Sequence, residues 1–263
     1  MKMNLKGALV LLSGVALLYS SCKKDSKAPA TQTSTKTASL DVVSSQVALN
    51  LYQSLSGAYG GVNLNNGIAA PGIASNASTK AVNSLTTTAT CGFFLDPAVD
   101  IKVNIGDTIK SETVGSIDFY FKCNPTGQHF GFTNDDSLYT VGKAPGYAYT
   151  FNSTQQYNVT AMNANNRLFS VGGNIKAFVD FTYPKTYPPL SVHDRIFFKG
   201  IVFDLEKDDI NAGTATFTST GTVGGASWSV DGTAEFLGNH KIRITIAGFT
   251  FTVNYLTGKV TTP

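Results

Sequence analysis

The chain has 263 residues, of which 42% are hydrophobic, 11% are aromatic and only 14% are charged, and its formal net charge is +3. Three arginines are too few to supply the guanidinium groups that typically bind phosphate, so the composition argues against nucleic-acid binding. Most of the aromatic residues are expected in a packed core.

Residues 1–21 have the three zones of a secretory signal peptide. Lys2 and Lys6 precede an apolar run from Gly7 to Leu18, and small residues follow it. A helix needs roughly 20 apolar residues to cross the hydrocarbon of a bilayer. This run of 12 residues therefore predicts a segment that is removed after export.

Leu18-Tyr19-Ser20-Ser21, directly before Cys22, resembles the lipobox of bacterial lipoproteins, in which small residues precede a cysteine that becomes the lipidated first residue. The resemblance implies a lipid anchor on Cys22 and a place in the cell envelope. Lys23, where an aspartate would favour retention, implies the outer membrane of a Gram-negative bacterium. An ordinary signal peptide with an incidental cysteine is the alternative.

Residues 22–38 contain many Lys, Ser and Thr and no large apolar side chain, which predicts a flexible tether because too little apolar surface can be buried. Six lysines and one acid, Asp25, lie before residue 39. Removing them from the totals of 20 basic and 17 acidic residues leaves 14 and 16, a net charge of about −2. The domain expected over residues 39–263 is therefore nearly neutral.

An amphipathic helix is predicted over about residues 40–56, where apolar residues recur at steps of three and four: Leu40, Val43, Val47, Leu51 and Leu55. Ser39 is placed to cap its first turn and Gly57 to end it. We expect the helix to lie on a sheet. A helix on the membrane surface is the alternative, but its polar face is Ser, Asn and Gln without lysine.

Residues 58–79 are small, polar and glycine-rich, which predicts a long surface loop, with a disordered insertion as the alternative. From residue 82 onward apolar and polar residues alternate with a period of two, as in strands with one wet face. Asn124-Pro125-Thr126-Gly127 suits a type I turn in a hairpin, and glycine-containing turns separate the last four strands.

The predicted fold class is mainly β, an antiparallel β-sandwich or barrel-like sheet with one N-terminal amphipathic helix, because no crossover helices interrupt the strands. Cys91 and Cys123 each share a strand face with apolar side chains, which predicts a disulfide between them in an oxidising compartment. Such a bond would contribute about 3 to 4 kcal/mol in the chain-entropy model. Two separate buried thiols are the alternative.

Signatures of catalysis and metal binding are missing from the sequence. His129, His193 and His240 have no second ligand at a suitable spacing, and no nucleophile elbow, zinc-protease motif or phosphate-binding loop occurs. The acidic segment 204–211 offers several oxygens but does not match a calcium loop, which favours a solvated acidic turn. We expect no catalytic residues, no metal and no cofactor.

Aromatic residues are the better candidates for ligand contact. Tyr147, Tyr149 and Phe151 share one strand face, with core packing favoured over ligand contact. In the segment 182–190, three prolines predict a stiff loop that orders Tyr183 and Tyr187 as a platform for a sugar ring or a partner's surface. The alternative is that these two tyrosines simply cover the end of the sheet.

These patterns favour a non-catalytic binding or structural role at the cell envelope, with a glycan or an envelope protein as the ligand. One rival is a glycan-acting hydrolase, which requires two carboxyl groups facing each other about 5 to 10 Å apart. The other is a carrier of lipid or lipoprotein, in which the helix covers a curved sheet and a dry, open cavity is lined by Phe and Ile.

Overall fold

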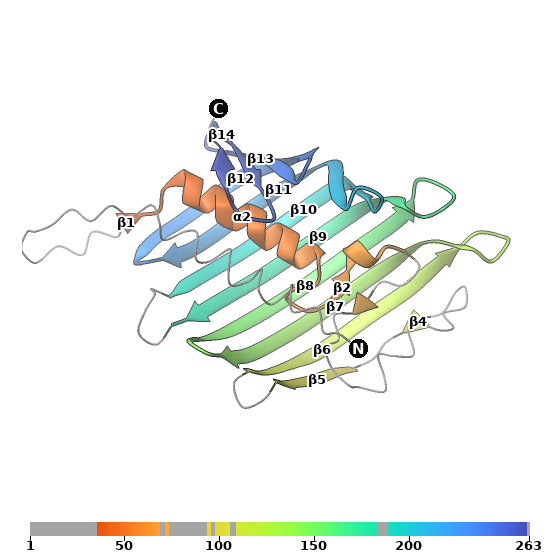
Figure 1. Ribbon diagram of the computed structural model, residues 1–263, viewed down its shortest axis with the longest axis horizontal. Coiled ribbons are helices and arrows are strands. Elements are labelled where there is room, and N and C mark those ends of the chain that lie inside the picture. Colours follow the sequence, from red (N-terminus) through yellow and green to blue (C-terminus); the bar gives the residue numbers. More distant parts are fainter. Residues whose placement is uncertain are drawn as a thin grey trace, which may run out of the picture.

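The computed structural model, shown in Figure 1, describes residues 36–68, 72–73, 94–95, 98–105, 109–183 and 189–261. The predicted signal peptide and Cys22 lie outside the described residues, as do Cys91 and Tyr187. Lipidation, the pairing of Cys91 and the role of Tyr187 therefore stay predictions. Among the described residues, no helix is both long and apolar enough to cross a membrane.

Most of the described chain forms one open sheet in which each long strand pairs with the next strand of the sequence (Figure 1). Its strands are β4 (Phe94–Leu95), β5 (Ala98–Ile105), β6 (Ile109–Cys123), β7 (His129–Ala144), β8 (Tyr147–Ala161), β9 (Leu168–Thr182), β10 (Leu190–Asp204), β11 (Asp209–Val223), β12 (Ala226–Gly238), β13 (Lys241–Ile246), β14 (Phe249–Asn254) and β15 (Val260–Thr261). The prediction of a mainly β, antiparallel fold with one N-terminal helix is confirmed. The long strands form a single open sheet.

Alternation with a period of two explains why these segments are strands. Along β8, for example, every second residue from Phe151 to Val159 is buried, while the residues that alternate with them are exposed or partly exposed. The predicted hairpin at 124–127 is also present, because the N–H of Gly127 donates to the carbonyl oxygen of Asn124 at 3.0 Å. The C-terminal meander is formed by β11 to β14.

The helix α2 (Leu40–Leu55) lies across one face of the sheet (Figure 1). It ends where predicted, since Gly57 has a φ of +70°. The predicted cap is only partly right: Ser39 is the N-cap residue, but its side chain makes no capping hydrogen bond. The turn after β14 closes over the helix, where the Ser45 hydroxyl donates to the carbonyl oxygen of Gly258 at 2.7 Å.

The helix is buried over more of its surface than an amphipathic pattern predicts. Its apolar stripe is covered, but five polar side chains are buried as well: Ser44, Ser45, Gln46, Asn50 and Ser54. The sheet face below the helix and the turn after β14 cover different sides of it. Polar groups buried in this way need protein partners, and the partner of Asn50 is described below.

A short strand, β1 (Lys36–Thr37), occupies residues that we assigned to the tether. It pairs in parallel with Ala226 and Ser227 of β12, and the N–H of Ala38 donates to the carbonyl oxygen of Ser227 at 3.0 Å. The edge of β12 at Ala226 and Ser227 is available to β1 because β13 pairs only with residues 232–238 of β12. We call the end of the sheet with the β7–β8, β9–β10 and β11–β12 turns the β1 end, and the other the opposite end.

Three further features complete the fold. β2 (Val62–Asn63) pairs with β3 (Gly72–Ile73) in a separate small sheet, and a 3-10 turn, η2 (Leu64–Asn66), lies between them in the chain. β6 ends at Cys123, whose disulfide with Cys91 stays a prediction.

Replacing Leu51 with alanine should destabilise the protein strongly. The side chain is 1% exposed in the core between α2 and the sheet, so its removal leaves a cavity that costs about 2 to 5 kcal/mol of unfolding free energy. Urea denaturation measures this loss. Phe249→Ala is the control, because Phe249 is 63% exposed and should change the unfolding free energy by less than about 0.5 kcal/mol. Equal losses in the two variants would contradict the packing described.

Candidate ligand-binding site

A chain of polar groups fastens α2 to the middle of the sheet. Asp194 on β10 is fully buried, and its carboxylate accepts a hydrogen bond from the Asn50 side chain at 2.7 Å and one from the Ser219 hydroxyl. The Ser219 oxygen in turn accepts from the indole N–H of Trp228 at 2.9 Å. On the helix side, the Tyr59 hydroxyl donates to Asn50 at 2.5 Å. The bond from Asn50 thus ties the helix to β10, and Ser219 and Trp228 extend the network to β11 and β12.

A second buried carboxyl group, that of Asp136 on β7, lies beside the segment that follows α2. The side-chain amide of Asn134 donates to it at 3.0 Å, and Gln155, its cross-strand neighbour, donates to the backbone carbonyl of Ser54 at 3.2 Å. Gly61 passes directly over the pair at φ +81°. A Cβ there would lie 2.6 Å from both the Asp136 carboxylate and the Gln155 carbonyl oxygen, so only glycine fits.

Burial changes the protonation of both carboxyl groups. It raises the pKa of Asp194 to about 6 and that of Asp136 to about 7, although hydrogen bonds from Asn50, Ser219 and Asn134 oppose the change. Both side chains are at most 1% exposed, so neither can reach a substrate. Their role is to position the helix. The burial of Asp194 could have been predicted from the sequence, because it alternates in phase with Val192 and Ile196 and so lies on the core face of β10.

The raised pKa values predict that stability falls as pH rises. An unfolded aspartate titrates near pH 3.9, so between about pH 4 and pH 7 the folded chain binds more protons than the unfolded chain. The free energy of unfolding should therefore be lower at pH 8 than at pH 5, by on the order of 2 kcal/mol. Asp194→Asn keeps an acceptor for Asn50 and should reduce this slope, as measured by urea denaturation across this range.

The control for this experiment is Asp231→Asn, because Asp231 is exposed on β12 and should leave the slope unchanged. A wild-type stability that is constant or rises between pH 5 and pH 8 would contradict the assignment.

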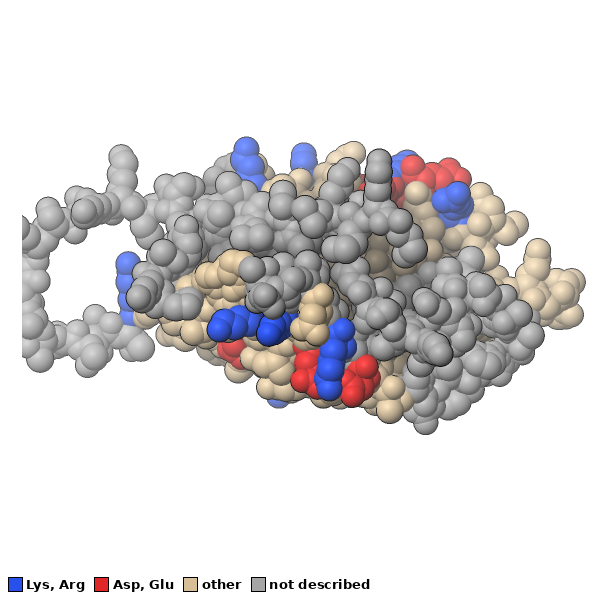
Figure 2. All heavy atoms as spheres, turned by 60° about the horizontal axis from the view of Figure 1, so that its bottom comes forward, with Lys and Arg blue, Asp and Glu red and all other residues tan. Residues whose placement is uncertain are grey.

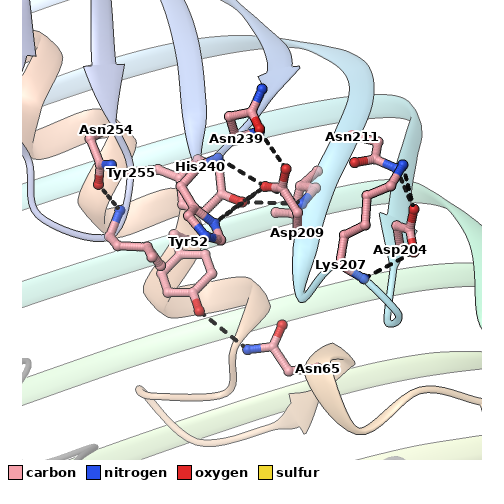
Figure 3. A network of polar contacts seen from close by, with 12 residues as sticks. Tyr52, Asn65, Asp204, Lys207, Asp209, Asn211, Asn239, His240, Asn254 and Tyr255 are labelled. Carbon is pink, nitrogen blue, oxygen red and sulfur yellow. Dashed lines mark hydrogen bonds and ion pairs between the residues drawn. The ribbon is translucent and has the colours of Figure 1, made fainter.

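The acidic segment 204–211 lies at the opposite end, where Figure 3 shows its contacts. Burial alone would raise the pKa of Asp209, but it accepts hydrogen bonds from the Tyr255 hydroxyl at 2.5 Å and from the backbone N–H groups of Asn239 and His240, and its pKa is lowered. Asp204 is tied to Asn211 at 2.7 Å. The prediction of a solvated turn therefore holds for the exposed Glu206 and Asp208, but it is wrong for these two aspartates.

The contacts of the three histidines are with neighbouring side chains. His129 stacks on Phe121 with ring centroids 4.4 Å apart, His193 packs edge-on against Phe178, and His240 lies 3.3 Å from the Tyr255 hydroxyl. Within the described ranges, no group of three or more His, Cys, Asp or Glu residues is arranged to hold a metal ion.

At the β1 end, aromatic residues of β8 and β9 meet in what we call the tyrosine cluster: Tyr147, Tyr149, Phe151, Phe181 and Tyr183. Tyr183 lies with its ring centroid 6.1 Å from that of Tyr147 and 6.3 Å from that of Phe181. The three tyrosines are half-buried, whereas Phe151 and Phe181 belong to the core. Tyr183, which was predicted to contact a ligand, thus lies beside the aromatic residues that were predicted to share one face of β8.

Rings in the tyrosine cluster also lie against one another. Tyr149 stacks on Phe151 at 4.8 Å with 24° between the planes, and Tyr183 lies nearly parallel to Phe181 at 14°. Tyr149 also fills the space above Gly142 on β7, where a Cβ would lie 2.0 Å from its ring. Burial raises the pKa of Tyr147, so its hydroxyl is a hydrogen-bond donor at neutral pH. Ring edges and hydroxyl groups are what the cluster offers a ligand.

One pair of carboxyl groups bears on the hydrolase alternative. Asp118 on β6 and Asp135 on β7 are cross-strand partners beside Tyr120, and they line a cavity of about 240 Å³. Directly opposed residues have Cβ atoms about 4.5 to 5.5 Å apart. Asp135 is exposed and accepts a hydrogen bond from Gln156 at 2.8 Å. A general acid needs a carboxyl group that is shielded from water, and the exposed Asp135 does not supply one.

The carrier alternative requires a void under the helix. The side chains expected to line it are packed instead: Ile175 and Ile196 are at most 1% exposed and Phe198 is 5% exposed, all in one cluster with α2. This part of the sheet face is a filled core.

Charge on the described surface is mixed. Figure 2 shows lysines next to carboxylates near the β5 edge, where Lys102 pairs with Glu112 at 3.1 Å and with Asp100 at 3.7 Å. Alternating signs of this kind do not favour binding to a polyanion such as nucleic acid. Comparison with family models, with curated proteins and with solved structures finds no match to this chain.

Proposed function

We propose that the chain is a lipid-anchored, non-catalytic binding protein of the cell envelope, held to the outer membrane of a Gram-negative bacterium through Cys22. The observation that supports a binding role is the tyrosine cluster. Three half-buried tyrosines rest on buried phenylalanines at one end of a packed sheet, so their positions are fixed before a ligand arrives. Binding to ordered side chains costs less conformational entropy than binding to mobile ones.

A protein partner fits the tyrosine cluster better than a glycan does. Sugar rings bind aromatic residues mainly by stacking on exposed ring faces, and here Phe151 covers a face of Tyr149. Tyrosine is enriched at the centres of protein interfaces, where its ring packs and its hydroxyl forms hydrogen bonds. We therefore assign the cluster to an envelope protein, with glycan binding as the alternative.

The position of β1 supports a partner close to the membrane. Lys36, Ala226, Val223, Leu190 and Phe181 are paired in one row across the sheet. The tyrosine cluster on β9 thus lies about three strand spacings, roughly 14 Å, from the strand that β1 joins. A lipid on Cys22 would hold the β1 end near the bilayer, because a tether of this length spans only about 20 Å root mean square when disordered.

The anchor is tested by replacing Cys22 with serine in the full-length chain. Without the thiol no lipid can be attached, so the protein should move from the membrane fraction to the soluble fraction of the cell. Immunoblotting of the two fractions, with an unaltered chain as the reference, measures the change. Continued association of the variant with membranes would overturn the lipoprotein assignment.

The tyrosine cluster is tested by photocrosslinking in cells. A photoreactive phenylalanine in place of Tyr183 should yield a discrete adduct containing a second polypeptide, and Tyr147→Ala in the same chain should reduce its yield at least several-fold. Thr216, exposed on the outer face of β11, is the matched control position and should yield no such adduct. An adduct that contains sugar and no second polypeptide would replace the protein partner with a glycan; identical patterns at both positions would overturn the site.

A further inference from the structure

A cavity of about 600 Å³ lies at the opposite end of the sheet, between the β6–β7 turn and the β8–β9 turn. This volume is within the roughly 300 to 1,000 Å³ that is usual for small-molecule sites. Phe130 and Met162 supply apolar surface to the lining. The polar lining consists of amide and imidazole side chains, those of Asn124, Gln128, His129, Asn163 and Asn166.

The loops around this cavity, which we call the amide pocket, are held by the same side chains that line it. Asn124 accepts hydrogen bonds from the backbone N–H groups of Thr126 at 3.1 Å and Gln128 at 2.9 Å. Asn163 accepts from the N–H of Leu168 at 3.1 Å. Because one end of each amide is fixed in its turn, the orientation of the other end is fixed as well.

The remaining ends of the amides are available to a ligand. Asn163 uses its carbonyl oxygen in the turn, which leaves its NH₂ group as a donor. Asn166 donates to the carbonyl oxygen of His129 at 2.9 Å, which leaves its own carbonyl oxygen as an acceptor. Gln128 accepts from Asn124 at 3.3 Å, which leaves a second NH₂ group. The pocket therefore combines donors and an acceptor in fixed places.

No Asp, Glu, Lys or Arg is among the residues that line the amide pocket. A charged ligand would therefore find no opposite charge in the lining. A hydroxyl group both donates and accepts hydrogen bonds, so it can satisfy an NH₂ group and a carbonyl oxygen together. The exposed Met162 side chain adds an apolar surface for the C–H groups of a ring.

We propose that the amide pocket binds an uncharged sugar, of monosaccharide to disaccharide size, through Asn163, Asn166 and Gln128. The pocket and the tyrosine cluster lie at opposite ends of β8, about 45 Å apart along a strand that runs from Tyr147 to Ala161. The sugar site is thus separate from the proposed protein contact, and neither proposal depends on the other.

The test is calorimetric titration of the purified full-length chain with the neutral sugars cellobiose, maltose and N,N′-diacetylchitobiose. At least one of them should bind with a Kd of about 1 mM or tighter. Asn163→Asp keeps the oxygen that accepts from Leu168 and removes the NH₂ donor, so the turn is preserved while the affinity should fall at least about tenfold.

Asn165→Asp is the matched control, because this neighbour makes a similar turn contact, accepting from the N–H of Arg167 at 3.2 Å, but does not line the pocket. The affinity of this control variant for the sugar should equal that of the unaltered chain. A lack of binding by all three sugars up to about 10 mM, or an unchanged affinity in Asn163→Asp, would overturn the proposal. So would tighter binding of glucuronate than of glucose, since it would indicate a site for anions.

Discussion

Only one face of the sheet is dry, and the packing of α2 on that face is the constraint on which the rest of the structure depends. The long strands alternate, so their core face needs a cover that an open sheet does not supply by itself. Apolar contacts of Val47 and Leu51 provide the cover, and the hydrogen bond from Asn50 to Asp194 determines where along the sheet the helix lies. The turn at Gly258 then closes over the helix.

Burying Asp194 and Asp136 costs stability, because removing a carboxylate from water is unfavourable even when it is hydrogen-bonded. Their raised pKa values express that cost. What the pair contributes is a defined position: an apolar helix could slide along an apolar face, whereas the hydrogen bond from Asn50 to Asp194 forms in one register only. Asp209 differs, because the several hydrogen bonds that its carboxylate accepts outweigh the effect of burial and lower its pKa.

The long strands also separate two kinds of surface. Near β1, the half-buried tyrosines lie against buried phenylalanines, a combination suited to a protein partner. At the opposite end, two turns enclose amide groups without any charged side chain, a combination suited to an uncharged sugar. A strand of 15 residues such as β8 keeps the two apart, and a chain anchored before β1 would hold the second site away from the membrane.

The sequence alone determined the antiparallel strands, the bounds of the helix to within one residue and the hairpin at 124–127, because these follow from local periodicity and turn chemistry. It also placed Tyr183 among candidate contacts. Only the tertiary structure decided that Tyr183 meets Tyr147, that Asn50 meets Asp194 and that two turns form the amide pocket. A period of two assigns a residue to a face, but what covers that face, and which distant residues become neighbours across it, depends on strand register and helix placement.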